Sequence, residues 1–485
     1  MRYWVRFAPE IMIKGSSVRK QLSAQLAENL KAVFAKRGIE ATFARHRDRI
    51  DVTVADPCAT AAEAALTQTP GVNQAWRVKT AQLDTPTLDA VAAAIVAEAA
   101  PRVTGKRFAV RARRKGTHPF TSQEIERAVG AALLAAAPNA QVDLTQPEVV
   151  VELELDGTQL AFVDARIPGL GGFPLGSQGE ALALVSGGFD STVASFMSLR
   201  RGVRTHFLFF NLGGAAHDLG VKQMSFYLWQ RFALSHRLHF ISVPFDGVVE
   251  ALLTQIPDSY MGVMLKRLML IAAERIADEM GIDALVTGES VAQVSSQTLR
   301  NLALIDSATR KLVLRPLAFV DKGEIITWAE RIGARQFAET MPEYCAVISR
   351  HPVTHGSFQR LAAVERRFDF ARLDEAIAAR EVTPVDQLPQ TINAQPAVPV
   401  VTTPEAGDEI LDIRPPERVK AAPLTLPHRV VPFFALKEAA KGFDPNRRYL
   451  LYCDKGVLSQ LHALRLRQAG FNQVYVFRPN GPPRP

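Results

Sequence analysis

The run Ser186-Gly187-Gly188-Phe189-Asp190-Ser191 has residue types suited to holding phosphate. It follows the apolar stretch Ala181–Val185, which predicts a buried strand, and it precedes a helical pattern. Glycines let backbone N–H groups approach phosphate oxygens, and the N-terminus of the next helix carries about half a positive charge. The run has neither the Gly-Lys-Ser/Thr ending of the Walker loop nor the spacing of the dinucleotide fingerprint. We therefore expect a phosphate-binding loop of another kind.

Asp190 is unexpected in such a loop, because its carboxylate would repel a phosphate. Its presence is explained if it helps to hold Mg²⁺ or positions the reacting groups. The structural alternative is that an acidic residue in the first helical turn favours the helix dipole, and we favour the functional interpretation. Histidines such as His206 and His239 show no ligand spacing, so no metal site built from protein side chains is predicted and Mg²⁺ is expected with the phosphate ligand.

A second strand–loop–helix pattern spans Leu450–Gln460, with Cys453 at the mouth of its loop. Backbone N–H groups at a helix N-terminus stabilise a thiolate, which is the form of cysteine that attacks sulfur. A phosphatase with this pattern would need an arginine six positions after the cysteine, where this chain has Ser459. A buried, unreactive cysteine is the structural alternative. On the residues alone, Cys345 and Cys58 are expected to be structural.

Positive charge is concentrated near the N-terminus. Residues 1–115 hold 20 Lys and Arg against 10 Asp and Glu, whereas the rest of the chain holds 37 against 39, giving a net charge of +8. In the stretch 106–113, Phe108 and Val110 alternate with Arg107, Arg111 and Arg113, which predicts a half-buried strand with a cationic face. Such a face suggests a polyanionic partner, and a solvated surface is the alternative.

The length of 485 residues predicts about three to four domains, and 47% hydrophobic with 22% charged residues excludes a largely disordered, collagenous or coiled-coil chain. No apolar run reaches the roughly 18 residues that cross a bilayer. The start of the chain lacks a secretory signal, and three cysteines indicate a reducing compartment. We expect a soluble cytoplasmic protein without a membrane partner.

The chemistry-bearing residues must be positioned by several α/β units. Strands are expected at 2–7, 50–54, 106–113, 148–155 and 159–163, and helices at 18–37, 88–99 and from the Thr121–Glu124 capping box to about 137. After the glycine-rich junction 169–176, buried strands at 181–185, 205–210, 239–243 and 284–287 alternate with helices at 191–201, 221–232, 262–280 and 322–332. This order predicts a doubly wound parallel sheet. Residues 381–408, with five prolines, are expected to be a linker before a last small α/β unit.

The phosphate loop resembles that of the ATP pyrophosphatases, which cleave ATP between the α and β phosphates and adenylate a substrate. Other segments extend the resemblance over essentially the whole chain, to the tRNA 4-thiouridine synthetase (tRNA uridine 4-sulfurtransferase) family, which is also implicated in thiazole biosynthesis. These segments are Pro9-Glu10-Ile11, Lys14-Gly15, the run from Phe210 to His217, Leu265-Lys266-Arg267, Thr287-Gly288-Glu289-Ser290, the run from Gln293 to Thr298, and the run from Met341 to Cys345. Ile410–Arg414 together with the Cys453 loop resembles a rhodanese domain, which carries sulfur as a cysteine persulfide.

The resemblance implies an α/β multidomain protein. Its expected parts are a ferredoxin-like α+β domain (1–61), a THUMP RNA-binding α/β domain (62–168), a doubly wound ATP-pyrophosphatase domain (177–383), a Pro-rich linker (384–404) and a small α/β rhodanese-like domain (405–485).

The resemblance also implies roles for residues. Lys322 would assist adenylation, Cys453 would carry the persulfide, and Cys345 would form a disulfide with Cys453 during turnover. Asp190 is expected to be catalytic as well. Without the family, Lys266 and Lys322 would be ordinary helix cations. The expected ATP contacts are Leu184, Val185, Ser186, Gly187, Gly188, Asp190, Ser191, Lys266, Gly288 and Gln297. The expected RNA contacts are Lys106, Arg107, Arg111, Arg113, Arg114 and Lys115.

The implied reaction is ATP- and Mg²⁺-dependent transfer of persulfide sulfur to uridine 8 of tRNA, with a cysteine desulfurase as sulfur donor. Sulfur transfer to the thiazole (thiamine) carrier protein is a second expected role. One alternative is a persulfide relay module for thiazole synthesis that binds tRNA without thiolating it. Another is a different ATP pyrophosphatase, such as an amidotransferase-linked synthetase, which would have no use for a thiol domain.

Overall fold

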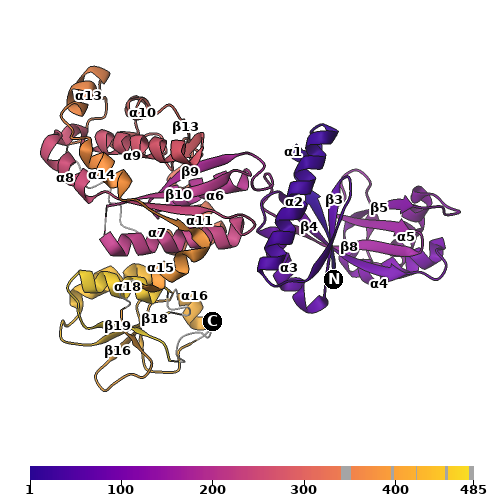
Figure 1. Cartoon of the computed structure of the whole chain (residues 1–485). Helices are drawn as coiled ribbons and strands as arrows, with labels where there is room; N and C mark the ends of the chain where they lie inside the picture. The colour runs from indigo at the N-terminus through magenta and orange to yellow at the C-terminus, as the bar shows by residue number, and fades with distance from the viewer. Residues whose placement is uncertain are drawn as a thin grey trace. The chain divides into compact units, whose positions relative to one another are not determined.

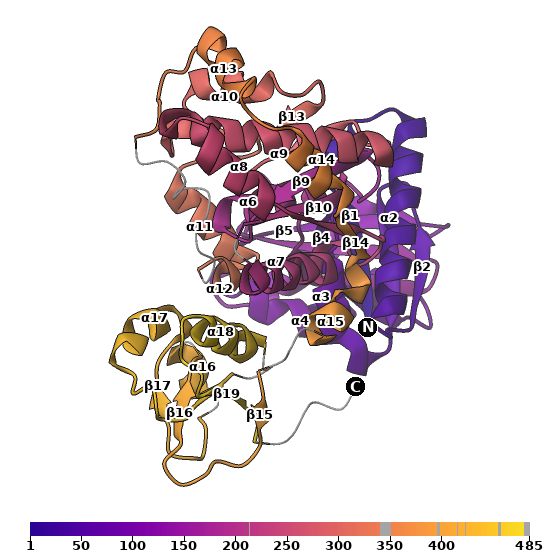
Figure 2. The same ribbon diagram turned by 60° about the vertical axis from the view of Figure 1, so that its left-hand side comes forward.

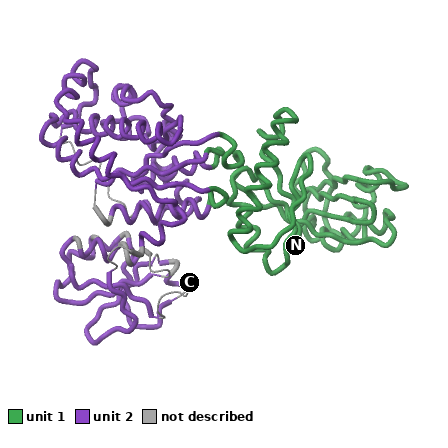
Figure 3. Tube along the Cα trace, in the orientation of Figure 1, with its two compact units in different colours: residues 1–178, 200–203, 232–236 green, residues 179–199, 204–231, 237–485 purple. Residues whose placement is uncertain are grey.

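The computed structural model describes residues 1–212, 214–339, 351–394, 398–414, 416–421, 423–453 and 457–479. The chain divides into two compact units (Figure 3). Unit 1 comprises residues 1–178 with 200–203 and 232–236, and unit 2 comprises residues 179–199, 204–231 and 237–485.

Unit 1 is built on one eight-stranded sheet of order β2-β3-β1-β4-β8-β7-β5-β6 (Figure 1). Its strands are β1 (Arg2–Phe7), β2 (Ala41–Arg45), β3 (Arg49–Val54), β4 (Val72–Gln82), β5 (Arg107–Lys115), β6 (Gln141–Val142), β7 (Val149–Asp156) and β8 (Gln159–Pro168). The predicted domain boundary at residues 61/62 falls inside helix α3 (Ala59–Thr67), and β1 pairs with β4 across it. The two predicted N-terminal domains therefore share one sheet.

One face of this sheet is covered by helices. They are α2 (Ser16–Lys36), α3, α4 (Leu88–Val103) and α5 (Ser122–Ala136), and the capping box of Thr121 and Glu124 that opens α5 is confirmed. On β8, Leu160 and Phe162 pack with α4 and α5, whereas Ala161 and Val163 point to the other face, where they meet Trp4 and Val78. We call this other face, which carries Arg2, Arg6, Arg49, Arg111, Arg113 and Arg166, the arginine face.

The first part of unit 2 is a six-stranded sheet of order β13-β12-β9-β10-β11-β14, parallel except for β14. The strands are β9 (Glu180–Val185), β10 (Arg204–Asn211), β11 (His239–Pro244), β12 (Ala284–Val286), β13 (Leu312–Leu314) and β14 (Glu381–Pro384). Helices on both faces confirm the predicted parallel α/β architecture (Figure 2). One face holds α8 (Asp246–Gln255), α9 (Asp258–Met280), α10 (Leu299–Asp306), α13 (Phe358–Glu365) and α14 (Ala371–Ala378), and the other holds α6 (Phe189–Arg200), α7 (Gly214–Leu228) and α11 (Lys322–Arg331).

The prediction for residues 381–408 is wrong in its first half. Glu381–Pro384 forms β14, which pairs antiparallel with β11, and helix α15 (Leu388–Ala394) follows. A proline is tolerated at an edge strand because no neighbouring strand needs its missing N–H group. Helices α8, α13 and α14 were not predicted either.

The last part of unit 2 is a five-stranded parallel sheet of order β15-β19-β18-β16-β17. Its strands are β15 (Val400–Val401), β16 (Glu409–Asp412), β17 (Arg429–Val430), β18 (Tyr449–Tyr452) and β19 (Val474–Phe477), and its helices are α16 (Pro416–Ala421), α17 (Leu436–Ala439) and α18 (Val457–Gln468). Among all helices in the described ranges, none combines the length and apolar composition needed to span a bilayer.

Candidate functional site

The predicted phosphate loop connects β9 to α6, at the carboxyl edge of the parallel sheet. The backbone N–H of Ser186 donates to Ser191 Oγ over 3.1 Å, and the two hydroxyls lie 3.2 Å apart, which closes the turn. Gly187 has a φ of +80°, a conformation that a residue with a Cβ rarely adopts. The loop is therefore a compact glycine turn that leads directly into the N-terminus of α6, the position at which helices bind anions.

Asp190 lies in the first turn of α6 and both of its carboxylate oxygens have donors. Lys322 Nζ donates to Oδ1 over 2.7 Å, and Gln293 Nε2 donates to Oδ2 over 2.8 Å. The structure thus brings together Asp190 and Lys322, two residues 132 positions apart that were each expected to act in adenylation. Gln293 had been quoted within a motif but not assigned a role.

Gly288 lies against the same loop. A Cβ at this position would come within 2.5 Å of the carbonyl carbon of Asp190 and 2.6 Å of the backbone nitrogen of Ser191. Glycine is therefore required at position 288 because the segment after β12 packs directly on the phosphate loop and leaves no room for a side chain.

Lys266 of α9 is held by a buried carboxylate. Its Nζ donates to Glu289 Oε1 over 2.7 Å, while Arg315 Nε donates to Glu289 Oε2 over 2.8 Å. Burial works to raise the pKa of Glu289, but the two neighbouring cations hold it below its ordinary value. The sequence patterns did not predict a role for Glu289 or Arg315, although Glu289 belongs to the motif Thr287–Ser290.

Gln297 is 8% exposed, and its Oε1 has no hydrogen-bond partner within the described residues. A buried amide oxygen without a donor costs free energy unless a ligand supplies one. Together with the glycine cradle of the loop, this orphaned acceptor fits a nucleotide. Asp190 fits Mg²⁺ accompanying it, because it is a carboxylate that already attracts a cation, Lys322.

Cys453 follows β18 and is 5% exposed. The backbone N–H of Ser459, in the first turn of α18, donates to Cys453 Sγ over 3.3 Å, and Ser459 Oγ lies 3.4 Å from the sulfur. These contacts provide the predicted placement of a sulfur atom at a helix N-terminus. Nearby, Asp412 and Arg414 form a buried ion pair at 2.6 Å. Cys345 lies outside the described residues.

The cations predicted to bind RNA lie along β5 or just before it. Arg107, Arg111 and Arg113 are exposed while Phe108 and Val110 are buried, so the predicted alternation is confirmed. Their contacts differ: Arg107 pairs with Asp143 and Glu148, whereas Arg111 Nη2 donates to the carbonyl of Leu144. Lys106 is exposed just before the strand, and Arg114 is half-buried with its guanidinium near the carbonyl of His118.

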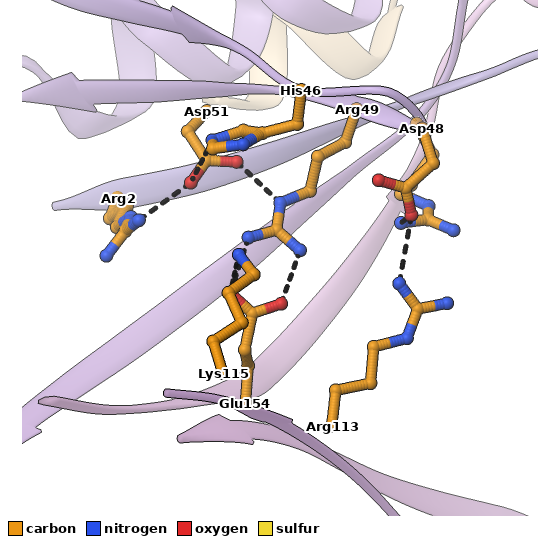
Figure 4. Close-up of polar contacts among 9 residues, drawn as sticks. Arg2, His46, Asp48, Arg49, Asp51, Arg113, Lys115 and Glu154 are labelled. Carbon is orange, nitrogen blue, oxygen red and sulfur yellow. Dashed lines mark hydrogen bonds and ion pairs between the residues drawn. The ribbon is translucent and has the colours of Figure 1, made fainter. Parts of the chain in front are cut away.

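Ion pairs cross the arginine face between distant strands (Figure 4). Arg49 of β3 forms two hydrogen bonds with Glu154 of β7, at 2.7 and 2.8 Å, and it also pairs with Asp51. Lys115 pairs with the same Glu154, and Arg113 pairs with Asp48. Burial alone would raise the pKa of Glu154, but Arg49 and Lys115 lower it to about 2.

Three family models match the chain. Residues 2–75 match the ThiI ferredoxin-like domain, residues 84–161 match the THUMP domain, and residues 176–370 match the model described as thiamine biosynthesis protein (ThiI).

Curated relatives match over the full length. The tRNA sulfurtransferase of Sodalis glossinidius is 43% identical over 487 residues, and that of Azotobacter vinelandii is 45% identical over 485 residues. Each alignment covers 99% of this chain and 100% of the relative. A crystal structure described as a 4-thiouridine synthetase–RNA complex with bound ATP is 26% identical with a TM-score of 0.68, covering 79% of this chain and 99% of that chain. PH1313 from Pyrococcus horikoshii, at 17% identity and a TM-score of 0.51 over 69% of this chain and 100% of its own, is similar in fold.

Proposed function

Because the chain belongs to the tRNA sulfurtransferase family, we propose that it uses ATP to transfer sulfur to a uridine of tRNA, giving 4-thiouridine at position 8. The observation that carries this proposal is the meeting of Asp190 and Lys322 at an intact Ser-Gly-Gly-x-Asp-Ser loop. A chain that had kept only a carrier role would have no need of that arrangement. The similar crystal structure of a 4-thiouridine synthetase, which is described as holding RNA and ATP, supports the proposal that this chain binds both.

The first half-reaction is adenylation at the phosphate loop. Uridine O4 attacks the α-phosphorus of ATP, the bond to the bridging oxygen breaks, and pyrophosphate leaves. This activation is needed because a carbonyl oxygen is a poor leaving group, whereas AMP is a good one. Ser186, Gly187, Gly188 and Ser191 would bind phosphate oxygens, and Lys322 would stabilise the charge that develops on them. The rest of the nucleotide would be held by Lys266, Gly288 and Gln297, together with Leu184 and Val185 at the end of β9.

Mg²⁺ bound with ATP would supply further neutralisation of the phosphates, and Asp190 is the residue that would hold it. Within the described ranges no group of three or more His, Cys, Asp and Glu side chains forms a metal cage.

The second half-reaction is sulfur transfer from a rhodanese-like C-terminal domain. A cysteine desulfurase loads Cys453 as a persulfide, whose terminal sulfur attacks C4 of the adenylated uridine, directly or as released sulfide, and AMP leaves. In the direct route, the Cys345 thiolate then attacks Cys453 Sγ, which breaks the sulfur–sulfur bond to the nucleotide and leaves a Cys345–Cys453 disulfide. A cellular dithiol returns both cysteines to thiols. The Ser459 N–H that donates to Cys453 Sγ supports a role for this sulfur at the N-terminus of α18.

Sulfur supply to the thiazole carrier protein of thiamine synthesis is a second proposed role. It is favoured by the description of the family model that matches residues 176–370, and it would need only the persulfide on Cys453.

The test follows sulfur from labelled cysteine, with a cysteine desulfurase, Mg·ATP and unmodified tRNA. Wild type should label tRNA. Cys453→Ser should bind ATP but transfer no label, and Asp190→Ala should load the persulfide without modifying tRNA. Cys58→Ser is the matched cysteine control, because Cys58 belongs to unit 1 whereas both loops belong to unit 2, and it should behave as wild type.

Two outcomes would count against the proposal. Label that stops on Cys453 with every tRNA tested would leave a persulfide relay. Wild-type transfer by Cys453→Ser would remove the persulfide scheme.

A further inference from the structure

We propose that Gln293 is a positioning residue that fixes the carboxylate of Asp190 for adenylation, so the inference rests on the function proposed above. Its Nε2 donates to Asp190 Oδ2 over 2.8 Å, on the oxygen that Lys322 does not contact. Gln293 comes from the segment after β12, whereas Asp190 comes from α6 and Lys322 from the start of α11. Three elements thus converge on one carboxylate.

The two partners of Asp190 differ in what they do when phosphate arrives. Lys322 is a cation on a flexible stem with 40% of its side chain exposed, and ATP would attract it away from Asp190. Gln293 is neutral and half-buried, so a phosphate does not compete for it as strongly. The hydrogen bond from Gln293 would therefore persist while Lys322 exchanges between the carboxylate and the phosphates.

The backbone around Gln293 is held in place from several sides. Ala292 has a φ of +65°, which is costly for a residue with a Cβ, and its N–H donates to the carbonyl of Gln297 over 3.0 Å. Val291 N–H donates to the carbonyl of Ala318 over 3.0 Å, and Ser290 Oγ donates to that of Val320 over 3.1 Å.

These contacts tie the segment to the turn between β13 and α11, the helix that begins with Lys322, and the close approach of Gly288 ties it to the phosphate loop. A strained residue next to Gln293, in a turn held by these hydrogen bonds, indicates that the direction of this side chain is specified.

A residue acting through Asp190 has a recognisable kinetic effect. Loss of the Gln293 donor would let the carboxylate rotate without removing any contact to ATP itself. The rate of pyrophosphate release at saturating ATP should therefore fall, while the affinity for ATP stays almost unchanged. Gln297, in contrast, is expected to contact the nucleotide, so its loss should weaken ATP binding.

The experiment compares full-length wild type, Gln293→Met, Gln293→Glu, Gln297→Met and Val294→Ala. Methionine keeps the length of the side chain without its donor, and glutamate puts a negative charge against Asp190. Val294→Ala alters the same turn at a side chain that is 40% exposed. The dissociation constant for ATP is measured by calorimetry, pyrophosphate release in a single turnover with tRNA, and folding by thermal unfolding and persulfide loading of Cys453.

We expect Gln293→Met to slow pyrophosphate release by about 10- to 100-fold with ATP affinity within about threefold. Gln293→Glu should be slower still, and Val294→Ala should match wild type. An unchanged rate in Gln293→Met, or a loss of ATP affinity equal to that in Gln297→Met, would overturn the inference alone. No pyrophosphate release by wild type would overturn the proposed function and the inference together.

Discussion

Gly288 and Gly262 differ in what an added methyl group would meet. At Gly288 a Cβ would lie 2.5 Å from the backbone of Asp190, whereas at Gly262, inside α9, nothing lies within 4 Å. Since the neighbour at Gly288 is backbone, the loop itself must move. We expect Gly288→Ala to weaken ATP binding by about tenfold or more, because overpacking costs about 1–3 kcal/mol.

Gly262→Ala is the matched control for that change. It should keep wild-type ATP affinity and raise the free energy of unfolding by about 0.5–1 kcal/mol, since alanine favours a helix interior over glycine. Calorimetry with ATP and denaturant unfolding measure the two effects. Equal ATP affinity in both variants would contradict the close packing of residue 288 on the phosphate loop.

Ser459 contacts the sulfur of Cys453 through both its backbone N–H and its hydroxyl. The Cys453 thiol donates to Ser459 Oγ, so replacing the hydroxyl removes this contact and leaves the backbone N–H as donor to the sulfur. We expect Ser459→Ala to slow alkylation of Cys453 by iodoacetamide about threefold to tenfold at neutral pH, since the hydroxyl can turn to donate to the sulfur when the sulfur attacks. The measurement uses a background with Cys58→Ser and Cys345→Ser, so that Cys453 is the thiol that reacts. Faster alkylation would mean that the hydroxyl shields the sulfur instead of activating it.

At the scale of elements, the ion pairs of the arginine face connect β3 to β7. Glu154 has a pKa lowered from 4.5 to about 2 by Arg49 and Lys115, against the effect of burial. A carboxyl group whose folded pKa is depressed contributes stability above its unfolded pKa and loses it as pH falls through the folded value. This contribution, on the order of 1–3 kcal/mol, should therefore be present at pH 6 and disappear between about pH 4.5 and 2.

The corresponding variant is Glu154→Gln, which keeps hydrogen-bond acceptor capacity but carries no charge. Its stability deficit relative to wild type should be largest near pH 6 and should shrink steadily towards pH 2.5. Hydrogen exchange of peptides from β3 and β7 in the full chain reports on this unit separately. A deficit independent of pH would show that shape, not charge, accounts for the role of Glu154.

Regular elements were predicted where the sequence pattern is local. The alternation in β5, the apolar run of β9 and the capping box of α5 each lie within a few residues, and each was found. The pairing of Arg49 with Glu154 could not be predicted, because it joins residues 105 positions apart through the curvature of a sheet. Short helices such as α13 and α14, with eight residues each, were missed because two turns give little periodicity.

For the candidate site, the sequence indicated the residues expected to act on ATP but not the neighbouring residues that hold them in place. Asp190, Lys322 and Gly288 were expected from motifs, and the structure brings them to one place. Glu289 and Arg315 stayed hidden because an ion pair that holds Lys266 leaves no spacing signature in the chain. The role of Cys345 remains a prediction.

At the scale of the whole molecule, the cationic excess of residues 1–115 overstates the charge available to RNA. Arg107 and Arg113 already pair with carboxylates, whereas Arg111 donates to a backbone carbonyl. We expect Arg111→Ala to reduce the slope of log K against log salt for tRNA by about 0.7–0.9, the value for one phosphate contact. Arg107→Ala should reduce this slope less, because Arg107 is already paired with Asp143 and Glu148, whose charges are left unpaired when the arginine is removed.

Fluorescence anisotropy with labelled tRNA between about 50 and 300 mM salt measures both slopes, where screening of such contacts changes most. Equal slopes in wild type and Arg111→Ala would place the RNA contact on other cations.

The continuous sheet of unit 1 also limits how this protein can be taken apart. A cut at residue 61 would separate β1 from β4 and leave two strands with rows of unpaired N–H and C=O groups, which is a template for aggregation. A graft of this unit onto another enzyme should therefore carry residues 1–178 as one piece. Recombination between relatives would be selected against at residue 61, where it would divide this sheet between two parents.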